Sequence, residues 1–360
     1  MSDTNQKLLA IIDSPSTVEI MINGAKSIFL EKDNGEVENP EFKFDSQESI
    51  LDFLKTYVGT EAESIGPERP YADLVAGDGS RVHVVLSPIA RECAYVTIRK
   101  RPKNQKNIED LVKNETLSRK AAAFLVFALE NRQNIMIVGG TSSGKTTLLN
   151  SLAAYLPDDA RTVVIEDVPE IDIDSERAVY LTTRLRDSHG LADVTLRDLV
   201  ANTLRMRPDR IVVGEIRGPE AMDLLQAMNV GHEGILSSLH ANSPKEALSR
   251  LETLAMMSAI SIPQKVVRIQ IAQALNLVVY MSRLADGSRK VIQISEVTGM
   301  ETDIITMQDL FSVLSKKLED SWKRELQPTG AVPRFYDKLR HTTENLPFEF
   351  FQRDTEQKNS

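Results

Sequence analysis

The chain has 360 residues, of which 41% are hydrophobic and 26% are charged, a composition typical of a globular protein with enough apolar residues for two cores. Its formal net charge of −9 argues against a general nucleic-acid binder, because nucleic-acid affinity rests mainly on cationic groups that neutralise phosphates. The single cysteine, Cys93, excludes an internal disulfide and any zinc site built from paired cysteines.

The amino-terminal stretch MSDTNQKLLAIID contains no basic segment followed by a long apolar one, and it therefore does not resemble a signal peptide. The longest apolar run, Ala121–Leu129, is well short of the roughly 20 residues that span a bilayer. We therefore expect the protein to stay in the cytoplasm.

Short β-type segments surround one helical segment in the first part of the chain, and turn-forming pairs such as Asp78-Gly79 separate them. The β-type segments are 17–22, 27–31 and 81–86, and the helical segment is 46–58. This pattern predicts a small α+β domain over residues 1–98. The polar, basic stretch 99–107 that follows is typical of a linker.

From residue 108 to residue 351 helices alternate with apolar strands, and the strands are predicted at 134–139, 161–167 and 209–215. Because these strands are apolar throughout, they indicate a parallel sheet that is covered on both faces. A hairpin and further helices are expected toward the C-terminal end of this domain. Residues 352–360 are expected to form a disordered tail.

The segment GGTSSGKTT follows an apolar strand directly and precedes a helical segment directly. It matches the phosphate-loop pattern G-x-x-x-x-G-K-[ST]. In that pattern glycines let backbone N–H groups turn toward a β-phosphate, the lysine reaches the β- and γ-phosphates, and the next hydroxyl ligates Mg²⁺. We therefore predict that ATP with Mg²⁺ is bound by Gly139, Gly140, Thr141, Ser142, Ser143, Gly144, Lys145, Thr146 and Thr147, with Thr146 on the metal.

Two of the apolar strands that follow the phosphate loop end in carboxylates, one in Glu166 and Asp167 and the other in Glu215. Because the carboxyl ends of strands in an open parallel sheet border the ligand crevice, these acids are expected near the loop. We assign water positioning or general-base catalysis to Glu215, and Glu166 is expected to support Mg²⁺ or to share that role. Helix capping or loop solvation is the alternative for either acid.

His232 and His240 are two of only five histidines in the chain, and they flank the apolar run ILSSL. This run follows the helical segment 219–229 and leads to the same crevice, with His240 at its end. Polar residues that merely end a buried strand are the alternative explanation.

Several motifs together resemble the secretion traffic ATPases that power type II and type IV secretion and pilus assembly. GGTSSGKTTLLN, VVIEDVPEI and the run from Leu204 to Leu254 resemble the ATPase domain of that superfamily, and STVEIMINGAKSIFLEK resembles its amino-terminal domain. SRLADGSRKVIQISEVTGME and PTGAVPRFYDKL are most similar to the tight-adherence (Flp) pilus branch. Branches with a tetracysteine zinc insert match poorly, because the chain has one cysteine.

This resemblance implies roles for the acids and histidines. Glu166 and Asp167 would form the Asp box of the family, Gly214-Glu215 its Walker B motif, and 231–240 its His box. His240 would then sense or orient the γ-phosphate. For His232 two roles stay open, one at the nucleotide and one in holding Glu215 or a loop in place.

Arginines are expected to supply positive charge, because the transition state of phosphoryl transfer is loose and negatively charged. Arg184, Arg186, Arg81 and Arg99 resemble family arginines that close onto the nucleotide between domains or subunits. Solvated surface arginines are the alternative for each.

The resemblance finally implies an α/β protein whose RecA-like, ring-forming ATPase domain follows the small α+β domain and assembles into a homo-hexamer. Nucleotide binding would swing one domain against the other and push on an inner-membrane platform protein, from the cytoplasmic side of the inner membrane. Assembly of a tight-adherence pilus is the favoured interpretation, and a type IV secretion or conjugation ATPase is the second. A nucleic-acid motor and a non-hydrolysing nucleotide switch are alternatives of other classes, although no direct nucleic-acid binding is expected.

Overall fold

The computed structural model describes residues 3–32, 35–91, 93–101, 107–184, 192–258, 262–318, 321–339 and 346–352. The chain divides into two compact units. The first comprises Met1–Asn104, Val168–Glu170 and Leu185–Asp193, and the second comprises Gln105–Asp167, Ile171–Arg184 and Val194–Ser360. Most of the linker predicted at 99–107 and almost all of the tail predicted at 352–360 lie outside the described residues.

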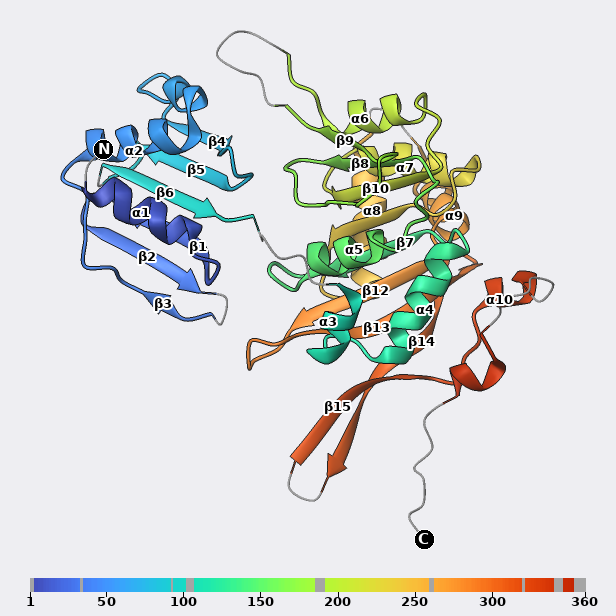
Figure 1. Cartoon of the computed structure of the whole chain (residues 1–360). Coiled ribbons are helices and arrows are strands. Elements are labelled where there is room, and N and C mark those ends of the chain that lie inside the picture. The colour runs from blue at the N-terminus through green and yellow to red at the C-terminus, as the bar shows by residue number, and fades with distance from the viewer. Residues whose placement is uncertain are drawn as a thin grey trace. The chain divides into compact units, whose positions relative to one another are not determined.

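The first unit is a small α+β fold (Figure 1). Its elements are α1 (Asp3–Asp13), β1 (Thr17–Asn23), β2 (Ser27–Lys32), β3 (Val37–Glu38), α2 (Gln47–Val58), the 3₁₀ helix η1 (Thr60–Ser64), β4 (Tyr71–Val75), β5 (Arg81–Leu86) and β6 (Ala94–Arg99). In its described part the strands form an antiparallel sheet in the order β3-β2-β1-β6-β5-β4.

Local sequence explains why the predicted elements of this unit form. Buried residues alternate with exposed or half-buried ones along β5, as expected of a strand with one covered face. The α2 helix begins after Ser46, whose hydroxyl accepts a hydrogen bond from the Ser49 backbone N–H in a capping box. The predicted α+β character is therefore confirmed, while α1, β4 and β6 were not predicted.

The second unit consists of a large sheet with helices on both faces (Figure 1). Its helices are α3 (Ile108–Lys113), α4 (Arg119–Glu130), α5 (Lys145–Ala153), α6 (Leu196–Thr203), α7 (Glu220–Asn229), α8 (Pro244–Met256), α9 (Gln264–Ala274), α10 (Arg334–Leu339) and the 3₁₀ helix η2 (Phe348–Phe351). Its strands are β7 (Ile135–Gly139), β8 (Thr162–Glu166), β9 (Val179–Thr182), β10 (Arg210–Ile216), β11 (Leu236–His240), β12 (Leu277–Arg283), β13 (Arg289–Glu301), β14 (Ile304–Leu318) and β15 (Ser321–Pro328).

The described strands of this unit lie in the order β15-β14-β13-β12-β7-β11-β10-β8-β9. From β12 to β9 each pair of neighbours is parallel, and β13, β14 and β15 extend the sheet as antiparallel strands. The predicted parallel core is therefore confirmed. The antiparallel extension is longer than the single hairpin that was expected.

Two apolar cores lie on opposite faces of this sheet, because successive residues of a strand point to opposite sides. Ile135 and Ile137 of β7 pack with α4 and α5, whereas Met136 and Val138 pack with the helices α6 to α9. Every residue of β7 is apolar or glycine and is buried, and helices cover both faces of the sheet at this strand, as its composition predicts.

The parallel strands bring their carboxyl ends to one edge of the sheet. In the register of β11 with β7, His240 lies opposite Gly139, and in the register of β12 with β7, Met281 also lies opposite Gly139. The loop between β7 and α5 begins at this edge. Among the described helices, none combines the length and the apolar character that crossing a bilayer requires.

Candidate active site

The phosphate-loop segment joins the end of β7 to the start of α5. Ser142 has a φ of 57° and Gly144 a φ of 98°, and both therefore have left-handed backbone conformations. Such alternation in a loop turns successive N–H groups toward a common anion. Gly144 is the N-cap of α5, and the helix begins at Lys145. Because glycine has no Cβ, Gly144 adopts the left-handed conformation without strain.

Gly139 and Gly140 differ in the space around them. A Cβ at Gly139 would lie 2.4 Å from Ser143 Oγ and 2.6 Å from the Met281 carbonyl oxygen. At Gly140 the nearest atom would be Asn242 Oδ1, at 3.7 Å. Of these two residues, only Gly139 must be glycine, because β7, β12 and the loop pack closely around it.

Lys145 is a buried lysine at the base of this loop. Its Nζ donates hydrogen bonds to the carbonyl oxygens of Gly139, at 3.1 Å, and Gly140, at 3.0 Å. It also lies 3.3 Å from His240 Nδ1. The ammonium group is thus held between the phosphate loop and the end of β11, where an entering anion would meet it.

Glu215 is held at both carboxylate oxygens by cationic or donor groups. His240 Nε2 lies 3.0 Å from Glu215 Oε1, and Arg217 Nη2 lies 2.8 Å from Glu215 Oε2. Arg217 also contacts Asp167, with Nη1 3.2 Å from Oδ2. This network connects the ends of β8, β10 and β11 and fixes the direction of the Glu215 carboxylate.

The pKa of His240 lies below its usual value of 6.5, chiefly because burial disfavours the charged imidazole. Glu215 raises the pKa, whereas the positive charges of Lys145, Arg217 and Arg250 lower it further. The neutral ring matches the contacts, since Nδ1 then accepts from Lys145 while the Nε2 hydrogen is donated to Glu215.

Glu166 is buried at the end of β8 and lies beside Gly214. Its Oε1 accepts a hydrogen bond of 3.0 Å from the Ile171 backbone N–H, which ties the carboxylate to the loop after β8. A Cβ at Gly214 would lie 3.2 Å from Glu166 Cγ, so this glycine lets the two acidic strand ends pack closely. Thr146 and Thr147 lie in the first turn of α5 and are half-buried and exposed, respectively.

Several predicted residues are not brought to this cluster. His232 precedes β11, at the sheet edge opposite His240, and its buried Nδ1 has no hydrogen-bond partner among the described residues. Its two predicted roles, at the nucleotide or in holding Glu215 or a loop in place, stay predictions. Arg184 is exposed and bridges Val194 through backbone hydrogen bonds, and Arg186 lies outside the described residues.

Arg81 and Arg99 belong to the first unit. They lie directly opposite each other on the neighbouring antiparallel strands β5 and β6. Arg81 forms an ion pair with Glu170, in which Nη2 lies 2.6 Å from Oε1. Their approach to a nucleotide stays a prediction.

Sequence reasoning missed two arginines at the site. Arg217, which bridges Glu215 and Asp167, follows Glu215 by two residues, and this short spacing could have suggested it. Arg289 donates from Nε to the Ser142 carbonyl oxygen at 3.0 Å. It is 147 residues distant from Ser142, and no local pattern could have indicated the contact.

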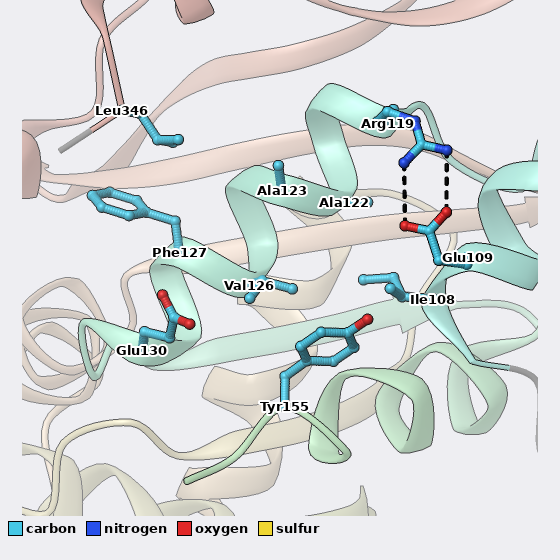
Figure 2. A pocket seen from close by; sticks show the side chains of 10 residues that line it. All are labelled: Ile108, Glu109, Arg119, Ala122, Ala123, Val126, Phe127, Glu130, Tyr155 and Leu346. Atoms are coloured by element: carbon cyan, nitrogen blue, oxygen red, sulfur yellow. Dashed lines mark hydrogen bonds and ion pairs between the residues drawn. The ribbon is translucent and has the colours of Figure 1, made fainter. Parts of the chain in front are cut away.

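A surface groove of about 460 Å³ lies elsewhere on the second unit, against α4 (Figure 2). Figure 2 shows its apolar floor of Ala122, Ala123, Val126 and Phe127, and the paired hydrogen bonds by which Arg119 binds Glu109. None of the residues lining it belongs to the cluster around Lys145. The groove is therefore separate from the candidate active site.

Comparisons with known proteins show what the whole chain is similar to. A family model described as "Type II/IV secretion system protein" matches residues 2–318. The chain is 33% identical over 302 residues to the conjugal transfer protein TrbB of Rhizobium radiobacter, covering 81% of this chain and 87% of the relative. It is 27% identical over 289 residues to the type IV secretion system protein VirB11 of Bartonella quintana, covering 70% and 80%.

Among solved structures, the ATPase DotB of Yersinia pseudotuberculosis is similar with a TM-score of 0.59. This match covers 83% of this chain and 79% of that chain at 16% sequence identity. At that identity the likeness concerns the fold.

Proposed function

The chain belongs to the type II/IV secretion system protein family, and from this premise we propose that it binds ATP with Mg²⁺ and hydrolyses it. The observation that carries the proposal is the chain of contacts from Lys145 through His240 to Glu215 at the carboxyl edge of the sheet. A phosphate-loop lysine, an oriented acid and a neutral imidazole between them are suited to positioning a γ-phosphate and a water.

The phosphate loop supplies the binding chemistry in this proposal. Its inward N–H groups and the amino-terminal end of α5 would receive the β-phosphate, and Lys145 would turn from the Gly139 and Gly140 carbonyls to the β- and γ-phosphates. In the part of the chain that the structure describes, the buried Ser143 Oγ of this loop has no hydrogen-bond partner, which fits a site whose remaining partner is a ligand.

Thr146 and Glu166 would hold Mg²⁺, because a hydroxyl and a carboxylate are the hard oxygen ligands that this cation prefers. When bound, Mg²⁺ would neutralise charge on the β- and γ-phosphates. Two protein oxygens suffice, since Mg²⁺ in such sites keeps waters and substrate phosphates as its other ligands.

Glu215 would orient the attacking water, with His240 and Arg217 fixing its two oxygens. His240 would stay neutral and would sense the γ-phosphate through Lys145, which leaves the unprotonated Nδ1 for the phosphates as the nucleotide enters. Arg217 is an additional cation near the developing charge, and Arg184, Arg186, Arg81 and Arg99 are proposed to complete the charge compensation between domains or subunits.

The biological setting is the finer part of the proposal. The relatives named for conjugal transfer and type IV secretion support a type IV secretion or conjugation ATPase over a tight-adherence pilus motor. We propose that it acts as a homo-hexamer at the cytoplasmic face of the inner membrane, against a platform protein. Residues 1–98 would move on residues 108–351 about the linker 99–107.

Lys145→Ala tests the proposed activity. ATP hydrolysis is expected to fall at least about 100-fold, and ADP affinity should weaken, because the buried cation at the phosphates is lost. Lys245→Ala is the matched control, since Lys245 is an exposed lysine of α8. Turnover of Lys145→Ala equal to that of Lys245→Ala would refute the assignment.

Two further measurements test the assembly and the competing class. Sedimentation of a slowly hydrolysing variant with ATP and Mg²⁺ should give a hexamer, and a monomer under the same conditions would contradict the ring. Single-stranded DNA should leave the wild-type hydrolysis rate unchanged, whereas strong stimulation would favour a nucleic-acid motor.

A further inference from the structure

The hairpin of β12 and β13 stands beside the phosphate loop. β12 pairs with β7 in parallel, and β13 begins at Arg289, opposite Arg283 at the end of β12. Asp286 Oδ1 accepts hydrogen bonds from the backbone N–H of Ser288, at 2.9 Å, and from its hydroxyl, at 2.6 Å, which closes the turn. The pairing of β13 with β12, and of β12 with β7, places the start of β13 on the side of the sheet edge where the loop begins.

Arg289 crosses the loop at its two left-handed residues. Its Nε donates a hydrogen bond of 3.0 Å to the Ser142 carbonyl oxygen. Its aliphatic stem lies over Gly144, where a Cβ would be 3.4 Å from Arg289 Cδ and 3.7 Å from Arg289 Cβ. One side chain thus contacts both residues on which the shape of the loop depends.

The Ser142 conformation needs such support. A residue with a Cβ adopts a positive φ only when its surroundings stabilise it, and the φ of Ser142 is 57°. The Ser142 carbonyl and the Ser143 N–H belong to one trans peptide, so holding the carbonyl oxygen toward Arg289 turns the Ser143 N–H to the other side, where it donates to the Gly140 carbonyl oxygen at 3.4 Å. Among the described residues, no carboxylate forms an ion pair with Arg289 that would draw it away.

We infer that Arg289 is a positioning residue of the phosphate loop, whose Nε hydrogen bond keeps Ser142 in the left-handed form that binds nucleotide phosphates. This inference rests on the proposed nucleotide binding and deepens it. It assigns to a hairpin far along the chain the task of ordering the loop before the nucleotide arrives, which lowers the entropy that binding must overcome.

Two substitutions separate the hydrogen bond from the charge. Arg289→Gln places an amide nitrogen at the position of Nε and removes the charge. Arg289→Lys keeps the charge but has a methylene group there. If Arg289 acts through the bond to Ser142, the Gln variant should bind ADP and pyrophosphate within about twofold of wild type, while the Lys variant should bind both about tenfold more weakly, which is about 1.4 kcal/mol.

Affinities for ADP and for inorganic pyrophosphate are measured by calorimetry on the full chain, with the thermal unfolding midpoint without ligand as the reference for folding. Arg283→Ala is the matched control, because it removes the same charge from the opposite position of the same hairpin. Unchanged affinity is expected for it. If Arg289→Lys weakens the binding of ADP and of pyrophosphate by the same factor, and its thermal unfolding midpoint is unchanged, the result supports positioning of the loop.

Opposite outcomes overturn the inference. If Arg289→Lys keeps full affinity and Arg289→Gln loses it, the positive charge of Arg289 supports binding, and the hydrogen bond does not. If both variants bind as wild type does, Arg289 has no role in binding. If the variants lose affinity only as far as their unfolding midpoints fall, Arg289 stabilises the fold and has no specific role at the loop. These results differ from failure of the proposed function, in which the wild-type chain and Lys145→Ala bind the two ligands equally.

Discussion

His240 connects Lys145 to Glu215 through one imidazole ring. Its Nε2 lies 3.0 Å from Glu215 Oε1, and its Nδ1 lies 3.3 Å from Lys145 Nζ. Because β11 lies between β7 and β10 in the sheet, the ring stands between the phosphate loop and the acid of the next strand. A change at the phosphates that moves Lys145 would therefore be transmitted to Glu215 through this side chain.

His240→Gln and His240→Asn should have different effects on hydrolysis. Gln places an amide at the position of Nε2 and keeps a donor for Glu215, whereas Asn reaches only the position of Nδ1. We expect about tenfold slower turnover for Asn than for Gln, at similar unfolding midpoints, because the direction of Glu215 is lost. Equal turnover in the two variants and wild type, measured at saturating ATP, would assign His240 to packing alone.

The lowered pKa of His240 predicts how stability depends on pH. Above the usual value of 6.5 the ring is neutral in both folded and unfolded chains, and its contribution is constant. As the pH falls below this value the unfolded chain takes up the proton first, so the free energy of unfolding decreases until the lower native pKa is passed. Urea unfolding between about pH 5 and pH 8 should show this loss in wild type relative to His240→Gln, which cannot titrate. A wild-type chain that gains stability relative to that variant on acidification would contradict the lowered pKa.

Much of this site follows from local sequence, because each acid or histidine ends an apolar strand. Glu166, Glu215 and His240 could be placed at one sheet edge from the alternation of strands and helices alone. His232 shows the limit, since it lies in the same short motif as His240 but precedes the strand and so lies at the opposite edge. A pattern of residue types does not distinguish the two ends of a strand unless its boundaries are known.

Strand order and long-range contacts were beyond prediction from patterns. The insertion of β11 between β7 and β10 decides that His240 reaches both Lys145 and Glu215, and such order depends on packing of the whole sheet. Arg289 reaches Ser142 for the same reason, since β12 lies beside β7. The strands β13 to β15 mix polar with apolar residues and form a long antiparallel extension, which a search for apolar runs does not detect.

Glu215→Gln and Glu166→Gln should separate the roles of the two acids. Glu215 is fixed by His240 and Arg217 at the sheet edge, whereas Glu166 is buried and accepts from Ile171. We expect Glu215→Gln to bind ATP with Mg²⁺ and hydrolyse it at least about 100-fold more slowly, because the charge that orients water is lost. Glu166→Gln should instead require more Mg²⁺ for half-maximal rate. If Glu166→Gln does not hydrolyse ATP while Glu215→Gln does, the two assignments are reversed.

Gly139→Ala and Gly140→Ala provide the most direct test of the loop geometry. A Cβ at Gly139 would lie 2.6 Å from the Met281 carbonyl oxygen, a backbone atom of β12 that cannot move without distorting the sheet. We expect a loss of about 2 kcal/mol in the free energy of unfolding, and weaker ADP binding, because the loop must shift. Gly140 lacks both a close neighbour and a positive φ, so its alanine variant should stay within about 0.5 kcal/mol of wild type. Chemical unfolding of the two variants decides the matter, and equal losses would show that the packing of β7 against β12 does not set the requirement for glycine.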